Sequence, residues 1–328
     1  MLWENEIVLR PQKYRYDALL IVSFGGPEKR EDVIPFLENV LRGRHVPAAR
    51  MLEVAEHYYR FDGRSPINDQ NRALIAALRE RISIPIYWGN RNWHPLLTDA
   101  VRQMRDEGIG CALAFVTSAF GSYSGCRQYI ENIEAARVAA GASARDSAPR
   151  IDKIPPFSGH PKFLEAMADR VRNACVELPQ GHLVFTAHSV PLAMARSSPY
   201  VAELERACAA LAGALGRGGD WKLAWQSRSG PLSQPWLEPD ICDYLRQIRR
   251  DVVVAPIGFL SDHMEVIYDL DVVARQVAEQ LGIRMVRART VETHPAMIEM
   301  IVDMLEQDHA PCEGACCAYN AGVRSSET

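Results

Sequence analysis

The chain has 328 residues, a length that suits two domains of ordinary size. Hydrophobic residues make up 48% of it and charged residues 24%, and the formal net charge of −4 without a basic patch argues against nucleic acid as a partner. No apolar run reaches the ~20 residues of a transmembrane helix and the N-terminus lacks signal-peptide features, so we expect a cytoplasmic protein without a transmembrane segment.

Apolar strand-like runs alternate with helical patterns along the chain, which is typical of an α/β fold with parallel sheets. The two halves also resemble each other in three collinear pairs of segments, namely 18–27 with 182–191, 87–91 with 224–228, and 114–129 with 253–268. The alternative is a chance alignment of short strand motifs. We interpret the matches as two similar Rossmann-like, doubly wound domains with a ligand cleft between them.

The division between these halves is expected in the Ala-, Gly-, Ser- and Pro-rich stretch 139–156. This predicts an N-terminal domain at 1–155, a C-terminal domain at 156–305 and a cysteine-bearing tail at 306–328. The helical pattern 296–305 closes the second domain.

In open parallel sheets, ligands bind at the carboxyl ends of the strands. The side chains expected at those ends are Phe24, Arg91, Ser122, His188, Arg228 and Glu265. A histidine in such a place is a candidate general base or metal ligand, and the alternative is a structural histidine bonded to loop backbone. Motifs for phosphate loops, dinucleotide binding and nucleophile elbows are absent from the sequence.

The segment 256–271 follows the buried strand pattern 252–255 and is rich in acids. Asp262, Glu265 and Asp269 have the spacing i, i+3, i+7, which predicts one shared helix face. The alternative is a solvated acidic helix start that complements the helix dipole. The position directly after a buried strand favours a site that handles protons or a metal ion.

The cysteines fall into two groups. Cys111, Cys175, Cys208 and Cys242 stand singly in apolar or helical surroundings and are expected to be ordinary thiols. The tail instead carries three cysteines within six residues, Cys312, Cys316 and Cys317. Such a group is suited to a metal ion or an iron–sulfur cluster, and either needs a fourth ligand from elsewhere.

Arginines and aromatic residues gather in the first half, in the segments 42–44 and 58–66. They are either surface charge in loops or a site for a flat apolar ligand edged by carboxylates. In the second case aromatic walls would cover the ligand's faces, and Arg and Ser would hold its carboxylates.

Five motifs together resemble the signatures of ferrochelatases, and the resemblance runs from about residue 17 to residue 305. They are FGGPE (24–28), FTAHSVP (185–191), WQSRSGP (225–231), PWLEP (235–239) and GFLSDHME (258–265). The resemblance implies two Rossmann-like domains with a porphyrin in the cleft between them. It also implies an enzyme that inserts Fe²⁺ into the porphyrin and releases two protons.

The resemblance assigns roles to individual residues. His188 corresponds to the family's histidine and Glu265 to the glutamate that opens an acidic line, so both are expected to handle the iron substrate or pyrrole protons. Asp269 is next in that line, and Val273 replaces the usual third acid. We expect Glu265 to face His188 across the porphyrin. Some members carry a Tyr near the iron at the position of Phe24, and Phe cannot ligate iron.

The chain is also similar to the actinobacterial type, whose members act on coproporphyrin III and bind a [2Fe–2S] cluster. The similarity assigns the cluster ligands as Cys126, Cys312, Cys316 and Cys317, with zinc as the alternative occupant. The expected contacts to the substrate, which has four carboxylates, are Phe24, Arg42, Arg44, Tyr58, Ser65 and Tyr129.

Several alternatives stay open at this point. The substrate is coproporphyrin III, giving coproheme, or protoporphyrin IX, and the metal is iron, cobalt or nickel. A non-catalytic tetrapyrrole-binding iron–sulfur sensor is the alternative from another class of protein. Transient contact with neighbouring heme-pathway enzymes is the expected partner interaction.

Overall fold

The computed structural model describes residues 14–43, 46–141, 148–230, 233–307, 312, 314–315 and 317–318. Two of the predicted site residues, Arg44 and Cys316, lie outside these ranges. Two four-stranded parallel sheets organise the described chain, in the orders β2-β1-β3-β4 and β6-β5-β7-β8. The predicted α/β class is therefore confirmed.

The strands are β1 (Ala18–Ser23), β2 (Ile86–Asn90), β3 (Cys111–Val116), β4 (Arg150–Lys153), β5 (His182–His188), β6 (Trp221–Gln226), β7 (Val252–Ala255) and β8 (Met285–Arg287). The helices of the first half are α1 (Val33–Leu41), α2 (Ala48–Tyr59), α3 (Ile67–Arg79), α4 (Leu97–Asp106) and α5 (Gln128–Ala139). Those of the second are α6 (Pro161–Glu177), α7 (Leu192–Arg196), α8 (Tyr200–Ala214), α9 (Ile241–Ile248), α10 (Met264–Tyr268), α11 (Arg275–Leu281) and α12 (Pro295–Glu306).

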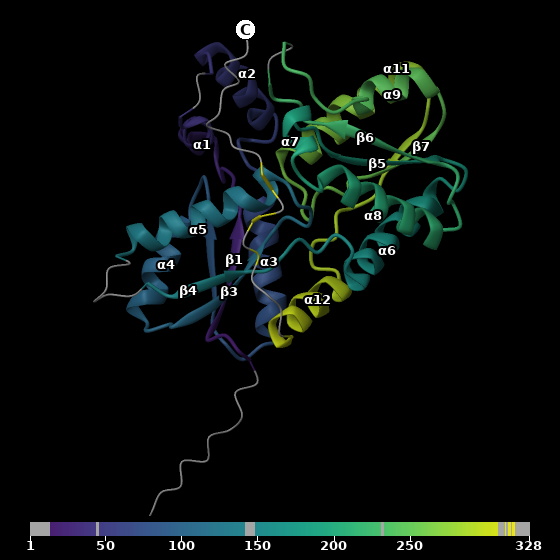
Figure 1. Cartoon of the computed structure of the whole chain (residues 1–328). Coiled ribbons are helices and arrows are strands. Elements are labelled where there is room, and N and C mark those ends of the chain that lie inside the picture. Colours follow the sequence, from purple (N-terminus) through teal and green to yellow (C-terminus); the bar gives the residue numbers. More distant parts are fainter. Residues whose placement is uncertain are drawn as a thin grey trace, which may run out of the picture.

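Helices cover both faces of each sheet, as strands that are apolar on both faces require. Alternate residues of β1 point to opposite faces, so Leu20 packs with α4 and α5 on the outer side and Ile21 packs on the inner side. The second sheet has α9 and α11 on its outer side. The inner faces of both sheets belong to one continuous hydrophobic core, in which α6 and α12 lie between the halves (Figure 1).

The three sequence matches occupy equivalent places in the two sheets. β1 lies between β2 and β3 in the first sheet, and β5 lies between β6 and β7 in the second, with all four pairings parallel. The carboxyl ends of β5, β6 and β7 therefore lie side by side, and the residues that follow them form one continuous surface. This arrangement is the structural counterpart of the duplication, whereas the exact division at residue 155 stays a prediction.

Helices α1 and α2 form a separate small unit beside the first sheet. They enclose their own apolar cluster, made by Val33, Phe36, Leu37 and Ala55. At its C-terminal end this unit is held by Gly63, which has a φ of +74° and lies so close to Arg30 that a Cβ would come within 2.4 Å of the Arg30 Cα. Because Arg30 lies just before α1, this contact brings the beginning and the end of the unit together.

Candidate functional site

His188 and Glu265 meet at the carboxyl edge of the second sheet. His188 is the last residue of β5, and Glu265 follows β7, which is hydrogen-bonded to β5. The imidazole Nε2 lies 3.4 Å from Glu265 Oε1, and the Glu265 side chain is 46% exposed, so a ligand can reach the pair. The expectation that Glu265 faces His188 across a porphyrin is therefore wrong. Adjacent strands place both residues on one wall, where no flat ring fits between them.

The surroundings of the pair determine where its proton lies. His188 Nδ1 contacts the Ser189 carbonyl, which only accepts, so Nδ1 carries a hydrogen and Nε2 faces Glu265. Burial alone would lower the pKa of His188, but the Glu265 carboxylate raises it above its usual value. Burial would likewise raise the pKa of Glu265, yet the neighbouring His188 brings it down to about 2. The pair is an imidazolium–carboxylate unit.

Asp269 extends this wall by one turn. The Ser227 hydroxyl donates to its carboxylate, and Ser227 has a φ of +63°, a left-handed conformation that is uncommon for a residue with a side chain. Burial raises the pKa of Asp269 to about 7, with a further contribution from the Glu265 charge and against the effect of the Ser227 hydrogen bond. Asp269 is thus an acid poised to exchange protons near neutral pH.

Asp262 does not belong to the acidic face that its spacing predicted. The helix begins only at Met264, so Asp262 precedes it. The Asp262 carboxylate instead binds Arg287, at 3.1 Å, together with Thr290 at 3.0 Å. Asp271 binds the same guanidinium at 2.7 and 2.8 Å. Arg287 therefore holds both of these acids in ion pairs, whereas Glu265 contacts His188 and Asp269 accepts from Ser227.

His263 is a site residue that the sequence reasoning did not assign. Its Nδ1 accepts the Glu265 backbone N–H at 3.2 Å and so caps α10. The remaining ring hydrogen is therefore on Nε2. Burial lowers the pKa of His263, and the positive charge of His188 lowers it further against the effect of Glu265. A neutral histidine thus stands beside the charged pair, and the signal for it was its place two residues before Glu265.

The first half supplies the facing wall. Burial raises the pKa of Tyr58 of α2, and the charges of Glu265 and Asp269 raise it further, so this phenol is within electrostatic range of both acids. Arg91 follows β2 and lies 5.8 Å from the ring centre of Phe24 and 4.6 Å from that of Tyr129. The structure therefore brings two predicted substrate contacts, Phe24 and Tyr129, around one arginine and a third, Tyr58, near the two acids.

Two other predicted substrate contacts are placed differently. Arg42 ends α1 in an exposed position, where its guanidinium donates to Asn39 at 2.6 Å. Ser65 is only 3% exposed, and its backbone N–H donates to the Pro27 carbonyl at 2.8 Å. Arg42 is free to meet a ligand at the surface, but Ser65 as placed gives a ligand no direct access.

The sequence matches the Ferrochelatase family over residues 16–309. This match spans nearly the whole described chain, including His188, Glu265 and the first-half residues described above. The chain belongs to the ferrochelatase family. It is accordingly an enzyme of the ferrochelatase class, which inserts iron into a porphyrin.

Curated ferrochelatases are similar along most of their length. The Ferrochelatase of Rhodopirellula baltica is 47% identical, with 93% of this chain and 94% of that protein covered. The Coproporphyrin III ferrochelatase of Nocardia farcinica is 45% identical, with 92% and 96% covered. That of Frankia alni is 48% identical, with 90% and 80% covered.

Solved structures of low identity share the fold. SirB from Bacillus subtilis, solved with Fe³⁺, gives a TM-score of 0.55 at 12% identity and covers 88% of this chain and 95% of its own. A multi-domain Deinococcus radiodurans protein with structural similarity to chelatases gives 0.53 at 14% identity, with 89% of this chain and 55% of that one covered. These likenesses support the chelatase fold alone.

The predicted cluster cysteines of this ferrochelatase come together in part. Cys126 lies in a π-helical turn, η2 (Tyr123–Arg127), and its Sγ is 3.6 Å from that of Cys312. Cys317 is buried, and the Arg127 guanidinium donates to its carbonyl at 3.1 Å. Within the described ranges, no group of three or more potential metal-ligating side chains is assembled. Cys316 lies outside these ranges.

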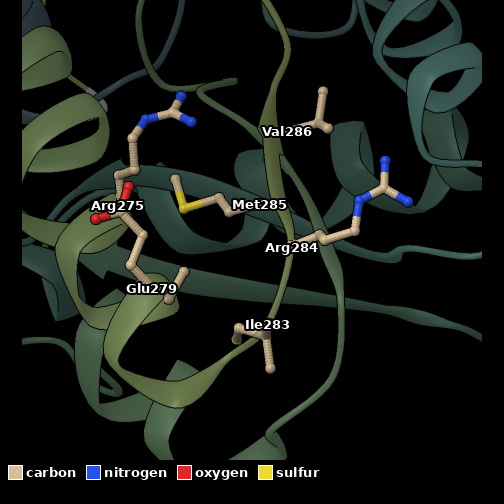
Figure 2. A pocket seen from close by; sticks show the side chains of 7 residues that line it. Arg275, Glu279, Ile283, Arg284, Met285 and Val286 are labelled. Atoms are coloured by element: carbon tan, nitrogen blue, oxygen red, sulfur yellow. The ribbon is translucent and has the colours of Figure 1, made fainter.

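Other features of the described chain lie apart from the cleft. A surface pocket beside β8 and α11 is shown in Figure 2, lined by Arg275, Ala278, Glu279, Ile283, Arg284, Met285 and Val286. It contains none of the residues of the His188 wall. None of the helices in the described part of the chain has the length and apolar character needed to span a bilayer.

Proposed function

We propose that this ferrochelatase inserts Fe²⁺ into coproporphyrin III, with the His188–Glu265 pair as its reactive wall. The choice of coproporphyrin III is supported by the several relatives of that name at 45–48% identity. The single observation that carries the mechanism is the 3.4 Å contact between His188 Nε2 and Glu265 Oε1 in a position a ligand can reach.

Metal insertion requires two pyrrole N–H groups to lose their protons while the iron substrate takes up the four ring nitrogens. A base that abstracts such a proton must lie within reach of the ring face. His188 and Glu265 present a protonated imidazole and a carboxylate to that face from one side. In our proposal the Glu265 carboxylate accepts each pyrrole proton, His188 orients that carboxylate, and Fe²⁺ approaches the porphyrin near the same two groups.

The proton then needs a path away from the ring. Glu265 has a pKa of about 2, so it binds a proton only weakly. Asp269 has a pKa of about 7, binds a proton more strongly, and interacts electrostatically with both His188 and Glu265. We therefore assign Asp269 as the next acceptor, held in place by the Ser227 hydroxyl. With Val273 in place of a third acid, the line ends after these two acids.

The roles of His188 and Glu265 are tested with His188→Ala. We expect iron insertion to be abolished while porphyrin binding, followed by the quenching of protein fluorescence, changes little. His160→Asn is a matched control, because it replaces a histidine that caps α6 away from the cleft. Near-normal iron insertion by His188→Ala would contradict the assignment of the His188–Glu265 pair as the reactive wall.

The substrate is tested by comparing coproporphyrin III with protoporphyrin IX under single-turnover conditions. We expect faster insertion into coproporphyrin III, because its two additional carboxylates have Arg42 and Arg91 to meet them. Faster insertion into protoporphyrin IX would contradict the proposal. Assays with Fe²⁺, Co²⁺ and Ni²⁺ for each porphyrin distinguish iron insertion from the insertion of another metal. Porphyrin binding without insertion of any of these metals would indicate a non-catalytic sensor.

We also infer that Cys126, Cys312, Cys316 and Cys317 bind a [2Fe–2S] cluster. The described residues fit such a group in two respects. The hydrogen bond from Cys126 lowers the pKa of Cys312, which favours the thiolate that iron requires, and the Lys153 charge acts in the same direction. The same hydrogen bond and burial raise the pKa of Cys126, so the pair shares one proton, and the Lys153 charge opposes that rise. When bound, the cluster would supply redox sensitivity or stability to the tail.

The cluster is tested with Cys126→Ser. We expect a brown protein whose visible absorption is lost in this variant and retained in Cys175→Ser, a control at a half-buried thiol. A colourless protein with stoichiometric zinc would contradict the proposal. The cytoplasmic location and the transient contact with heme-pathway enzymes stay predictions.

A further inference from the structure

A ring stack joins the two halves beside the catalytic wall. His57 of α2 and Tyr268 of α10 have ring centroids 3.8 Å apart and planes 13° from parallel. The Arg60 guanidinium lies 5.8 Å from the same tyrosine ring. Helices α2 and α10 thus contact each other from opposite halves of the molecule.

Both partners are adjacent to residues of the site. His57 precedes Tyr58, whose pKa is raised by burial and by the charges of Glu265 and Asp269. Tyr268 is the last residue of the five-residue helix that contains Glu265, and it precedes Asp269. The stack therefore connects a residue next to the first-half wall with the helix that places the second-half acids.

The second half holds α10 in place. This helix continues without a break into η3 (Asp269–Ala274) and α11, and its Val266 is fully buried in the core of the second half. Helix α2 belongs to the α1–α2 unit, which has a core of its own and whose two ends meet where Gly63 lies against Arg30. The stack therefore joins this unit to the second half, and its loss should loosen α2 and expose the last turn of α10.

We propose that the His57–Tyr268 stack is a positioning contact that fixes the spacing between α2 and α10 and so slows the release of the porphyrin. The inference deepens the proposed function and rests on it for the identity of the ligand. Without the stack, the Tyr58 wall and the Glu265 wall separate more readily, and a bound ring escapes sooner. Neither His57 nor Tyr268 is assigned a chemical step.

The test compares His57→Ala and Tyr268→Ala with His57→Phe and Tyr268→Phe. Hydrogen–deuterium exchange of the ligand-free protein should become about two- to tenfold faster in both α2 and α10 for the alanine variants, the range expected for an aromatic pair. The phenylalanine variants keep a stacking ring and should restore slow exchange. Leu52→Ala, on the exposed side of α2, is the control for substitution in that helix.

A second measurement addresses the ligand. The dissociation rate of coproporphyrin III, followed by stopped-flow fluorescence, should rise about two- to tenfold in either alanine variant. The double variant should be no faster than the single ones, because one contact can be lost only once. Additive effects, or unchanged exchange in α2 and α10, would overturn the proposal. Failure of the wild-type protein to bind coproporphyrin III would count against the proposed function, while the exchange result still decides on the stack.

Discussion

Arg287 separates the acids of the segment 256–271 into two groups with different roles. Its side chain is 12% exposed, and it binds both Asp262 and Asp271. Glu265 and Asp269 lack this partner and are left to interact with His188 and Ser227. The acids look alike in sequence, and it is the position of a single guanidinium on β8 that distinguishes them.

This distinction predicts the effect of Arg287→Leu. Removing the cation leaves Asp262 with only the Thr290 hydroxyl and Asp271 with only the more distant Arg275, at 3.7 Å. The loss of this partly buried pairing should lower the free energy of unfolding by about 3–5 kcal/mol. Urea denaturation measures the change. Arg246→Leu is the control, since its pair with Asp243 is exposed and should be worth about 1 kcal/mol or less. Equal effects of the two substitutions would show that Arg287 is not a structural clamp.

At the scale of elements, three helices begin with a histidine cap. His160, His263 and His294 each accept a backbone N–H through Nδ1, at 3.2 Å, at the start of α6, α10 and α12. Proline follows the cap in α6 and α12, where its fixed φ suits the first helical position. A ring nitrogen can accept such a hydrogen bond only while it is unprotonated.

His160 allows the effect of protonating such a cap to be measured. Burial lowers its pKa below the usual value, with Lys162 adding to the effect and Asp303 opposing it. The unfolded chain therefore binds a proton at this residue before the folded one does, and stability falls as the pH falls below the unfolded pKa of ~6.5. His160→Asn keeps an accepting cap that does not titrate.

We expect the unfolding free energy of His160→Asn to depend less steeply on pH than that of the wild-type protein between pH 7 and 5. Urea titrations at several pH values measure the slope. An unchanged slope would mean that His160 does not titrate differently in the two states. The effect should be absent above pH 7.5, where both states hold the histidine neutral.

At the scale of the whole molecule, the two similar halves share a core. Phe163 of α6 is fully buried, with its ring centroid 5.9 Å from that of Phe157 and 6.2 Å from that of Phe120. Phe157 in turn stacks at 5.3 Å on Phe115 of β3, in the first sheet. These rings link the helix layer of the second half to the first sheet, so neither half has a complete core without the other.

The shared core predicts cooperative unfolding. Phe163→Ala should cost about 3–5 kcal/mol and shift the unfolding of both halves together. Single-tryptophan variants that retain Trp88 in the first sheet or Trp225 in the second report on each half separately. Val176→Ala, at a residue 75% exposed, should have little effect. Two separate transitions in the Phe163→Ala protein would show that the halves are stable on their own.

The sequence alone was enough to indicate the α/β class and three pairs of matching segments in the two halves, because hydrophobic periodicity and turn residues are local signals. It also singled out His188 and Glu265, since one ends a buried strand and the other follows one. It could not place them on one wall, because the distance between them depends on β5 and β7 being neighbours in the sheet. It also could not show that Arg287 forms an ion pair with Asp262, or that the Arg91 guanidinium lies over the Tyr129 ring.

Contacts between residues far apart in the chain depend on how the two halves pack. His57 and Tyr268 are on elements whose patterns carry no sign of each other, and they stack only because the two halves close on one another. Local sequence determines which side chains a helix or strand presents, whereas packing of the halves determines which of them meet. The sequence of this ferrochelatase therefore indicated its motifs and several of its strand ends. Only the fold determined which acid pairs with which cation and which aromatic rings stack.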